Sequence, residues 1–364
     1  MLERYQPTPP LENQPVIPLT RDYNRTADVV EATKRLVAGL REDRDEFRMF
    51  ALLGNVLELE PELLMPVIRG SIDLAQRNLG QNRRSGSSAT LLYPIDAGIR
   101  VTAKRKGLIN GDPLSASNWN VDSVTEILRT FPNEVTELAG NNTTSKNLPQ
   151  RAGHLLWLLD QCPLVSPRQP LSFLEIGASG GLILDALKQP QKFQRWMQTK
   201  GYRSDYARKA NPGRINSTLG IDLVKPDLDW LQAVILEDDL RSETTDFISE
   251  FSRSNVIVES AANLAKSIEI QSFLTENKFA FPVVFSCFVF YQLDEAVREN
   301  VTKQSRSILQ QQGGGLLIIS DIAKYRGYPE KAGGCVSWIE DQDGKQVSPK
   351  IMLSKSTLTQ WEVL

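Results

Sequence analysis

A short apolar strand that ends in a glycine-rich turn is the feature that most constrains the fold of this chain. The strand is expected over residues 171–177, and glycines at 177, 180 and 181 lead into a helix expected over 181–188. A backbone without side chains can turn tightly there and approach another group closely. Such a strand–turn–helix unit is typical of the first connection in an α/β protein.

The alternation of strands and helices continues toward the C-terminus. Four more apolar strands are expected at 219–223, 255–259, 281–290 and 315–321. Helical spacing fills the intervals at 229–251, 262–277 and 294–311. This order predicts an α/β fold with a doubly wound, mostly parallel sheet. Residues 336–340 and 346–353 flank an Asp-Gln-Asp-Gly turn, which predicts a C-terminal antiparallel hairpin.

The first part of the chain has a different pattern. We expect an extended arm over 1–25, a helical region over 26–165 and the sheet domain over 166–364. Apolar residues at helical spacing predict helices at 27–40, 47–57, from Pro61 onward, 121–128 and 150–159. Weak alternation predicts a short strand at 91–99, and polar residues predict a long loop at 189–217.

Charge and cysteine content exclude several classes of protein. The formal net charge is −2, so no sequence-wide field attracts nucleic acid or an anionic membrane. The basic residues Arg100, Lys104, Arg105 and Lys106 are interpreted as a solvated helix face. The 3 cysteines are far apart and odd in number, which indicates a reducing cytoplasm rather than a disulfide framework. No run approaches the roughly 18 apolar residues of a membrane span.

The glycine turn is compatible with three kinds of chemistry, and the single histidine argues against the first. Residues 177–181 match G-x-S-x-G, the nucleophile turn of serine hydrolases. That chemistry needs a histidine base, which in this fold follows the serine along the chain. His154 is the chain's 1 histidine and precedes Ser179. We therefore reject a hydrolase.

A dinucleotide-dependent oxidoreductase fits the turn poorly. The fingerprint G-x-G-x-x-G has Ser179 in place of its second glycine. Its ribose-binding acid should follow about 20 residues on. Asp222, the best acid, lies much farther along the chain.

The third kind, binding of S-adenosylmethionine, suits the acidic residues around the turn. Glu175 precedes Gly177 by two positions, and a carboxylate beside the turn suits a ligand that carries a sulfonium and an ammonium group. Asp222 and Glu259 end the next two expected strands, where they can accept hydrogen bonds from the ribose and lie near the adenine. The expected cofactor-binding residues are Glu175, Gly177, Ala178, Ser179, Gly181, Asp222, Leu223, Glu259, Ser260 and Ser286.

Two later segments resemble class I S-adenosylmethionine-dependent methyltransferases. Residues 283–293 look like the fourth strand and following loop of that family, and residues 313–321 look like its glycine turn and fifth strand. The resemblance implies a Rossmann-like domain and the cofactor S-adenosylmethionine. Ser179 and Pro282 depart from the family pattern. The Asn/Asp-Pro-Pro-Tyr motif of enzymes that methylate nucleic acid bases is absent from the fourth strand.

A closer resemblance is to an uncharacterised, largely bacterial family known as domain of unknown function 2332. Its pattern T-N-E-x-x-R-x-x-x-L is similar to residues 147–155, with Leu148 in place of the glutamate. Its patterns L-E-x-G-A-S-A-G-L and G-x-D-x-x-P-x-D followed by W-L are similar to 174–182 and to 220–231. Because this family has no settled activity, the resemblance implies a fold more than a reaction.

These observations predict a methyltransferase that acts on an unidentified small-molecule acceptor. Asn147, Arg151 and Cys287 are the candidate acceptor-binding residues, and Tyr291 and Asp294 are candidates for taking a proton. We expect the helical region to cover the acceptor pocket as a lid. Two alternatives remain open. The chain could be a catalytically silent module that binds an adenosyl nucleoside or a partner, or an enzyme that cyclises or eliminates the aminobutyrate chain of the same cofactor.

Overall fold

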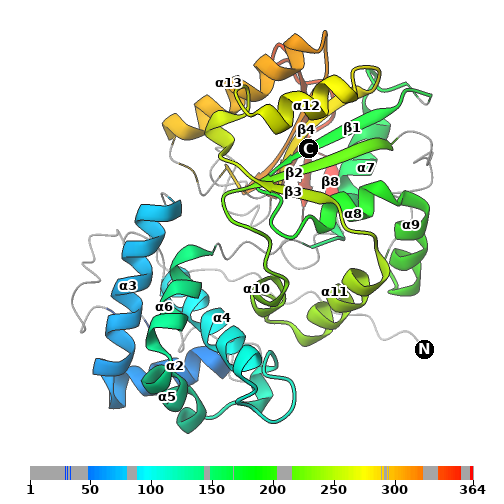
Figure 1. The fold of residues 1–364 in the computed structure, drawn as a ribbon. Helices are drawn as coiled ribbons and strands as arrows, with labels where there is room; N and C mark the ends of the chain where they lie inside the picture. The colour runs from blue at the N-terminus through cyan, green and yellow to red at the C-terminus, as the bar shows by residue number, and fades with distance from the viewer. Residues whose placement is uncertain are drawn as a thin grey trace.

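The computed structural model describes residues 29, 31, 33, 48–79, 88–142, 148–166, 168–202, 215–287, 289–290, 293, 295–322, 335–353 and 361–363. Two parts are visible in Figure 1, a group of helices and a sheet flanked by helices. The expected arm at 1–25 and nearly all of the expected loop at 81–88 lie outside the described residues.

Eight strands form one sheet with the order β3-β2-β1-β4-β5-β6-β7-β8. The first five strands are parallel, and β6, β7 and β8 run antiparallel to their neighbours. All six residues of β1 are buried, as expected for a central strand covered on both faces. The order 3-2-1-4-5 is that of a doubly wound, Rossmann-like sheet, which confirms the predicted fold class. The strands are β1 (Leu171–Ile176), β2 (Ile215–Asp222), β3 (Asn255–Val258), β4 (Phe281–Cys287), β5 (Leu316–Ile322), β6 (Cys335–Asp341), β7 (Ile351–Leu353) and β8 (Trp361–Val363).

Alternation along the strands divides the core of the sheet part into two layers. Phe173 packs on the side of α7, α8 and α9, whereas Leu174 packs on the side of α12 and α13. Figure 1 shows these helices on opposite sides of the strands. The helices of this part are α7 (Arg151–Gln161), α8 (Leu182–Lys188), α9 (Pro190–Thr199), α10 (Leu228–Ala233), α11 (Asp238–Glu250), α12 (Ile268–Glu276) and α13 (Glu295–Gln311), with a short 3-10 helix η6 (Ala261–Asn263).

The helical part has a hydrophobic core of its own. Leu53, Ile68, Ile95 and Val135 are each fully buried in it and come from four different helices. The amphipathic spacing seen in the sequence supplies these core residues. The helices are α2 (Arg48–Leu59), α3 (Pro61–Leu79), α4 (Ser88–Lys106), α5 (Val121–Thr130) and α6 (Pro132–Asn141), with a 3-10 helix η3 (Ala116–Asn118).

Helix α10 joins the two parts by packing against α4. Arg100 is 1% exposed and forms an ion pair of 2.6 Å with Asp96. The same guanidinium donates to the carbonyl of Leu114 in the helical part and to the carbonyl of Ala233 in α10. Tyr93 also donates its hydroxyl to the carbonyl of Val234. A buried guanidinium with this many acceptors fixes the junction.

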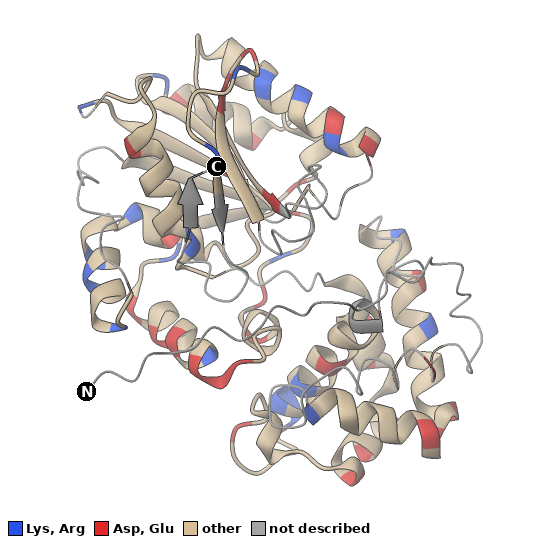
Figure 2. Cartoon of the chain, turned by 180° about the vertical axis from the view of Figure 1, so that it is seen from behind, with Lys and Arg blue, Asp and Glu red and all other residues tan. Residues whose placement is uncertain are grey.

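The structure corrects three expectations from the sequence. Residues 91–99 belong to helix α4 and not to a strand, because the apolar residues there pack on several other helices. The polar stretch 189–217 contains α9, which buries Phe193, Trp196 and Met197. Arg100 does not belong to a solvated face, although Lys104 and Arg105 are partly exposed and pair with Asp229 and Asp227. Figure 2 shows the blue residues at the end of α4 close to α10.

Within the described residues, no helix is long and apolar enough to cross a membrane.

Candidate functional site

The turn after β1 folds back toward β2 and contains a strained residue. Ser179 has φ 47°, the one positive value among the described residues other than glycine. Gly177 and Gly181 both have φ 72°, which glycine adopts freely. The amides of Gly177 and Ala178 donate to the carbonyl of Ile221, each at 2.9 Å. The turn is therefore tied to the end of the neighbouring strand.

Asp222 is the last residue of β2 and contacts the turn directly. Its Oδ2 accepts a hydrogen bond of 2.7 Å from the amide of Ser179, and its Oδ1 accepts one of 3.4 Å from the amide of Val224. Burial raises the pKa of the Asp222 carboxyl, and these backbone amides act in the opposite direction. The structure thus brings Asp222 to the turn, as expected for parallel strands that end at one edge of the sheet.

Glu175 lies one residue before the end of β1 and is 1% exposed. Among the described residues, none offers a hydrogen bond to its Oε2. Burial raises the pKa of this carboxyl well above 4.5, the nearby Asp222 adds to the increase, and the charge of Arg151 opposes it. A buried carboxyl oxygen without a partner costs free energy, so its presence at the end of β1 calls for an explanation.

Arg151 opens α7 and brings a positive charge to the same region. Arg151 is 6% exposed, and its positive charge lowers the pKa values of Glu175, His154 and Cys287. An electrostatic effect on all three groups places the guanidinium near them. The cationic Arg151 and the buried carboxyl group of Glu175 therefore interact electrostatically.

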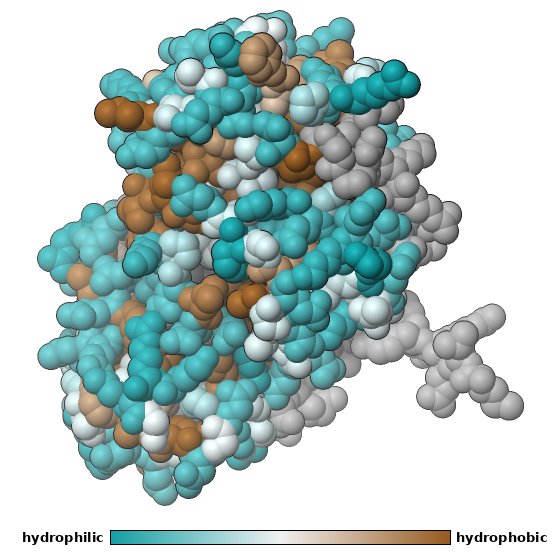
Figure 3. Space-filling view, turned by 45° about the vertical axis from the view of Figure 1, so that its right-hand side comes forward, coloured by the Kyte–Doolittle hydropathy of each residue, from teal (hydrophilic) through white to brown (hydrophobic). Residues whose placement is uncertain are grey.

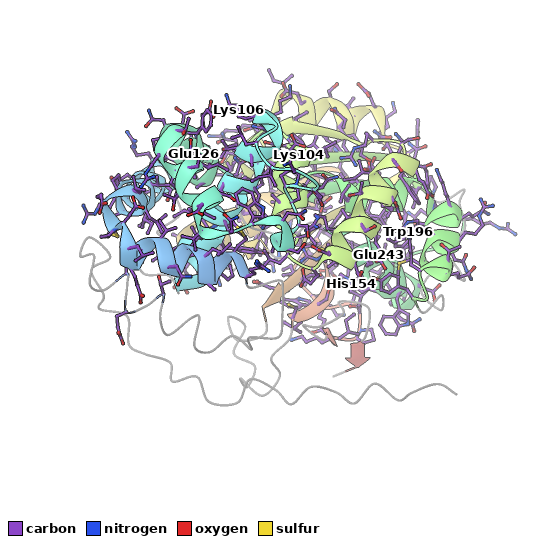
Figure 4. All side chains as sticks on the ribbon, turned by 90° about the horizontal axis from the view of Figure 1, so that it is seen from below. Lys104, Lys106, Glu126, His154, Trp196 and Glu243 are labelled. Atoms are coloured by element: carbon purple, nitrogen blue, oxygen red, sulfur yellow. The ribbon has the colours of Figure 1, made fainter. Side chains whose placement is uncertain are left out.

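His154 lies one helical turn after Arg151 and is completely buried. Its Nε2 is 3.0 Å from the hydroxyl of Ser320, which is 2.6 Å from the hydroxyl of Ser337. Burial, with the nearby Arg151, lowers the pKa of His154 to about 3, so the ring is neutral at physiological pH. Figure 4 shows His154 on the side of the sheet part, away from Lys104 and Lys106.

Cys287 ends β4 opposite Ser320 of β5. Burial and the neighbouring Glu175 raise the pKa of its thiol to about 12. The thiol is therefore protonated and a poor nucleophile. The thiol also forms a hydrogen bond with Ser320, the serine that contacts His154.

The remaining cofactor candidates lie around the same edge of the sheet. The backbone amide of Glu259 donates to the carbonyl of Asp222 at 2.9 Å, but its carboxylate accepts from the amide of Ser260 at 2.8 Å. Ser260 caps η6, and its hydroxyl accepts a hydrogen bond from the amide of Ala262. Leu223 is 42% exposed. Ser286 is buried beside Ile176, and no described group hydrogen-bonds its hydroxyl.

Apolar side chains cover parts of the turn closely. A Cβ added to Gly177 would lie 2.2 Å from Cγ2 of Val289, and one added to Gly180 would lie 2.7 Å from Cδ2 of Leu231. These contacts explain why side chains are missing at both positions. They also mean that a ligand which approaches Gly177 from the side of Val289 must displace that side chain.

Three candidates lie outside the described residues. They are Asn147, Tyr291 and Asp294. Their roles in acceptor binding and proton transfer stay predictions.

Two further residues at the turn were missed from the sequence. Arg253 donates to the carbonyl of Gly180 and forms an ion pair with the buried Asp185. Arg253 is far from the turn along the chain and belongs to no motif, so no local pattern reveals it.

In the segment G-x-D-x-x-P-x-D, the second aspartate, Asp227, caps α10 and pairs with Arg105, which is a structural role.

No family model matches this chain, and no curated protein matches it. The resemblance to domain of unknown function 2332 therefore stays a prediction. Among solved structures, the chain is similar to PKMT2 from Rickettsia typhi in complex with AdoHcy, with 16% identity, a TM-score of 0.25, and coverage of 48% of this chain and 25% of that chain. It is also similar to the CcbJ methyltransferase from Streptomyces caelestis, with 14% identity, a TM-score of 0.27, and coverage of 61% and 73%. Because these scores are low, the Rossmann-like fold is assigned from the strand order alone.

Proposed function

We propose that this chain binds S-adenosylmethionine at residues 175–181 and 222 and transfers its methyl group to a small-molecule acceptor. The observation that carries this proposal is Glu175. Its carboxyl group is buried at the turn, and its Oε2 has no hydrogen-bond partner among the described residues. An ammonium group placed there would pair with the carboxylate and remove the cost of burying it.

The other groups at the turn fit the rest of the same ligand. Asp222 keeps acceptor capacity beyond its two backbone amides and suits the ribose hydroxyls. Arg151 suits the carboxylate of the amino acid end, beside the ammonium at Glu175. Leu223 and Val258 are exposed at the ends of β2 and β3 and suit the flat face of adenine. Figure 3 shows several hydrophobic residues, in brown, on one face of the molecule.

The residues of this chain would contribute alignment and exclusion of water. When bound, S-adenosylmethionine supplies an electrophilic methyl carbon for an in-line displacement. Holding two reactants in line converts a bimolecular step into an effectively unimolecular one. His154 is unsuited to act as a base because its pKa is about 3 and its Nε2 bonds Ser320. Where the acceptor must lose a proton, Tyr291 or Asp294 is proposed to take it.

Calorimetric titration with S-adenosylmethionine and S-adenosylhomocysteine tests the site. The wild type should bind both, and Glu175→Ala and Asp222→Ala should each weaken binding by about tenfold or more, the effect of losing one charge-assisted hydrogen bond. Glu340→Ala is the matched control, because Glu340 is also a shielded carboxylate but pairs with Arg306. Absence of binding by the wild type would rule out the proposal.

Mass spectrometry of the nucleoside product separates the reactions that use this cofactor. With candidate acceptors present, S-adenosylhomocysteine indicates methyl transfer. 5′-Methylthioadenosine indicates attack within the aminobutyrate chain. Binding without either product indicates the catalytically silent module.

A further inference from the structure

Arg253, which is remote from the glycine turn in sequence, donates a hydrogen bond to that turn. Arg253 lies between α11 and β3, and its guanidinium donates one hydrogen bond to the carbonyl of Gly180. A second nitrogen of the same group forms an ion pair with Asp185. Asp185 is in the first turn of α8, its side chain is completely shielded from solvent, and its other oxygen accepts from the amide of Ser254.

This arrangement differs from an ordinary surface ion pair. The Arg253 side chain is 35% exposed, but its partner Asp185 is 0% exposed. Burial raises the pKa of Asp185, and Arg253 with Ser254 opposes that increase. A rigid guanidinium fork can bind a carboxylate and a carbonyl at once, which the single ammonium of a lysine does less well. The fork therefore fixes the position of Gly180 relative to α8.

The strained residue of the turn is pinned on both sides. The amide of Ser179 is bound by Asp222, and the carbonyl of Gly180 is bound by Arg253. These two groups belong to the peptide planes that bracket residues 179 and 180. A non-glycine residue with positive φ is strained, and it persists where the surrounding structure restrains it. Asp222 and Arg253 supply that restraint from the two ends of the segment 179–180.

We propose that Arg253 is a positioning residue for the nucleoside site and presets the conformation of the turn through the carbonyl of Gly180. This inference rests on the proposed function, because it assigns Arg253 to the same binding site. Arg253 does not touch the ligand in this account. Its effect on binding comes from a turn that is already in the binding conformation before the ligand arrives, which removes an ordering cost.

Hydrogen–deuterium exchange in the ligand-free protein tests the effect on the turn. The variants are Arg253→Ala and Arg253→Lys, with Arg306→Ala as the matched control. Arg306 also has a 35% exposed side chain and pairs with a shielded carboxylate, that of Glu340. Glu340 is paired with Leu317 near the start of β5, whereas the turn follows the end of the parallel strand β1. Exchange of the peptide that covers residues 177–184 should accelerate about tenfold in Arg253→Ala, should change less in Arg253→Lys and should not change in Arg306→Ala.

Calorimetry with S-adenosylhomocysteine tests the consequence for binding. The dissociation constant should rise about tenfold in Arg253→Ala, as expected for one lost hydrogen bond from a charged group, whereas Arg306→Ala should bind like the wild type. The melting temperatures of both alanine variants should fall by similar amounts. A difference in affinity between them then reflects the position of the turn and not a general loss of stability. If Arg253→Ala does not fold, Arg253→Lys carries the comparison.

Different results would overturn the positioning role of Arg253 and the proposed function. Unchanged exchange at 177–184 in Arg253→Ala would overturn the positioning role, whatever the wild type binds. Equal affinity of Arg253→Ala and Arg306→Ala would overturn it as well. A wild type that binds neither S-adenosylmethionine nor S-adenosylhomocysteine would overturn the proposed function, while the exchange result would still show whether Arg253 holds the turn.

Discussion

The backbone amide of Ser179 donates a hydrogen bond of 2.7 Å to a carboxylate oxygen of Asp222. This bond joins the turn after β1 to the end of β2, across two strands that lie side by side in the sheet. The carboxylate proposed to bind the ribose thus also stabilises the turn proposed to hold the amino acid end. Loss of Asp222 should therefore weaken the binding of both the ribose and the amino acid end of the ligand.

Replacing Gly177 by alanine should destabilise the protein more than the same change at Gly107. Both glycines have positive φ, at 72° and 65°, but only Gly177 has a side chain, that of Val289, where the Cβ would lie. An L-residue in this conformation costs about 1–2 kcal/mol, and overpacking adds about 1–3 kcal/mol. Urea unfolding should show a loss of about 2–5 kcal/mol for Gly177→Ala and about 1–2 kcal/mol for Gly107→Ala.

A second substitution checks the cause of that difference. Val289→Ala removes the methyl groups that would meet the new Cβ. Gly177→Ala combined with Val289→Ala should recover the steric part of the loss and keep the conformational part, giving a measurable coupling free energy. Strictly additive losses would show that Val289 does not cover the turn in solution.

The stability of the ligand-free protein should depend on pH through Glu175. Its pKa is raised by burial, so the folded state keeps a proton that the unfolded chain loses above about pH 4.5. Because the unfolded state then binds fewer protons, stability falls as pH rises from 4.5 toward the folded pKa, by at most about 1.4 kcal/mol per pH unit. Urea melts of wild type and Glu175→Gln between pH 5 and 8 should converge at low pH and diverge as pH rises.

Ligand binding should reverse that effect. An ammonium group beside Glu175 favours the ionised carboxylate, so binding should release a proton from the raised carboxyl. Affinity for S-adenosylhomocysteine should then increase with pH until the free-state pKa is passed, by at most about tenfold per unit for one proton. Calorimetry in buffers of different ionisation enthalpy measures the release, and an equal release in Glu175→Gln would assign the proton elsewhere.

The junction between the two parts should depend strongly on Arg100 and weakly on Lys104. Arg100→Ala leaves Asp96 buried without its ion-pair partner, a change that typically costs about 3–5 kcal/mol. Lys104→Ala breaks an ion pair with Asp229 in which both side chains are about a third exposed, at 36% and 34%, and should cost less than about 1 kcal/mol. Equal losses in urea unfolding would contradict the structural role assigned to Arg100.

The fold was predictable because its pattern is strong and local. The buried strand at 171–176 is a short apolar run that stops at glycine, and the hairpin turn at 341–344 carries its own signature. Predictions from weaker patterns were wrong where tertiary contacts determine the secondary structure. Residues 91–99 alternate enough to suggest a strand, but their packing against helices makes them helical.

The site was predictable only in part. Glu175 and Asp222 could be placed because strand ends of a parallel sheet meet at one edge. Arg253, Asp185 and the burial of Arg100 could not be placed, because each depends on contacts between segments more than 60 residues apart in sequence, such as the pairing of Arg253 with Asp185 at a separation of 68. Sequence spacing carries no information about such pairs.

A calorimetric comparison of S-adenosylhomocysteine with 5′-methylthioadenosine tests the central claim most directly. The two nucleosides share adenine, ribose and sulfur, but only the first carries the amino acid group that Glu175 is proposed to recognise. We predict that the wild type binds S-adenosylhomocysteine at least about tenfold more tightly, and that Glu175→Gln clearly reduces this preference while it keeps the affinity for 5′-methylthioadenosine. Equal affinity of the wild type for both nucleosides, or no binding of either, would contradict the account.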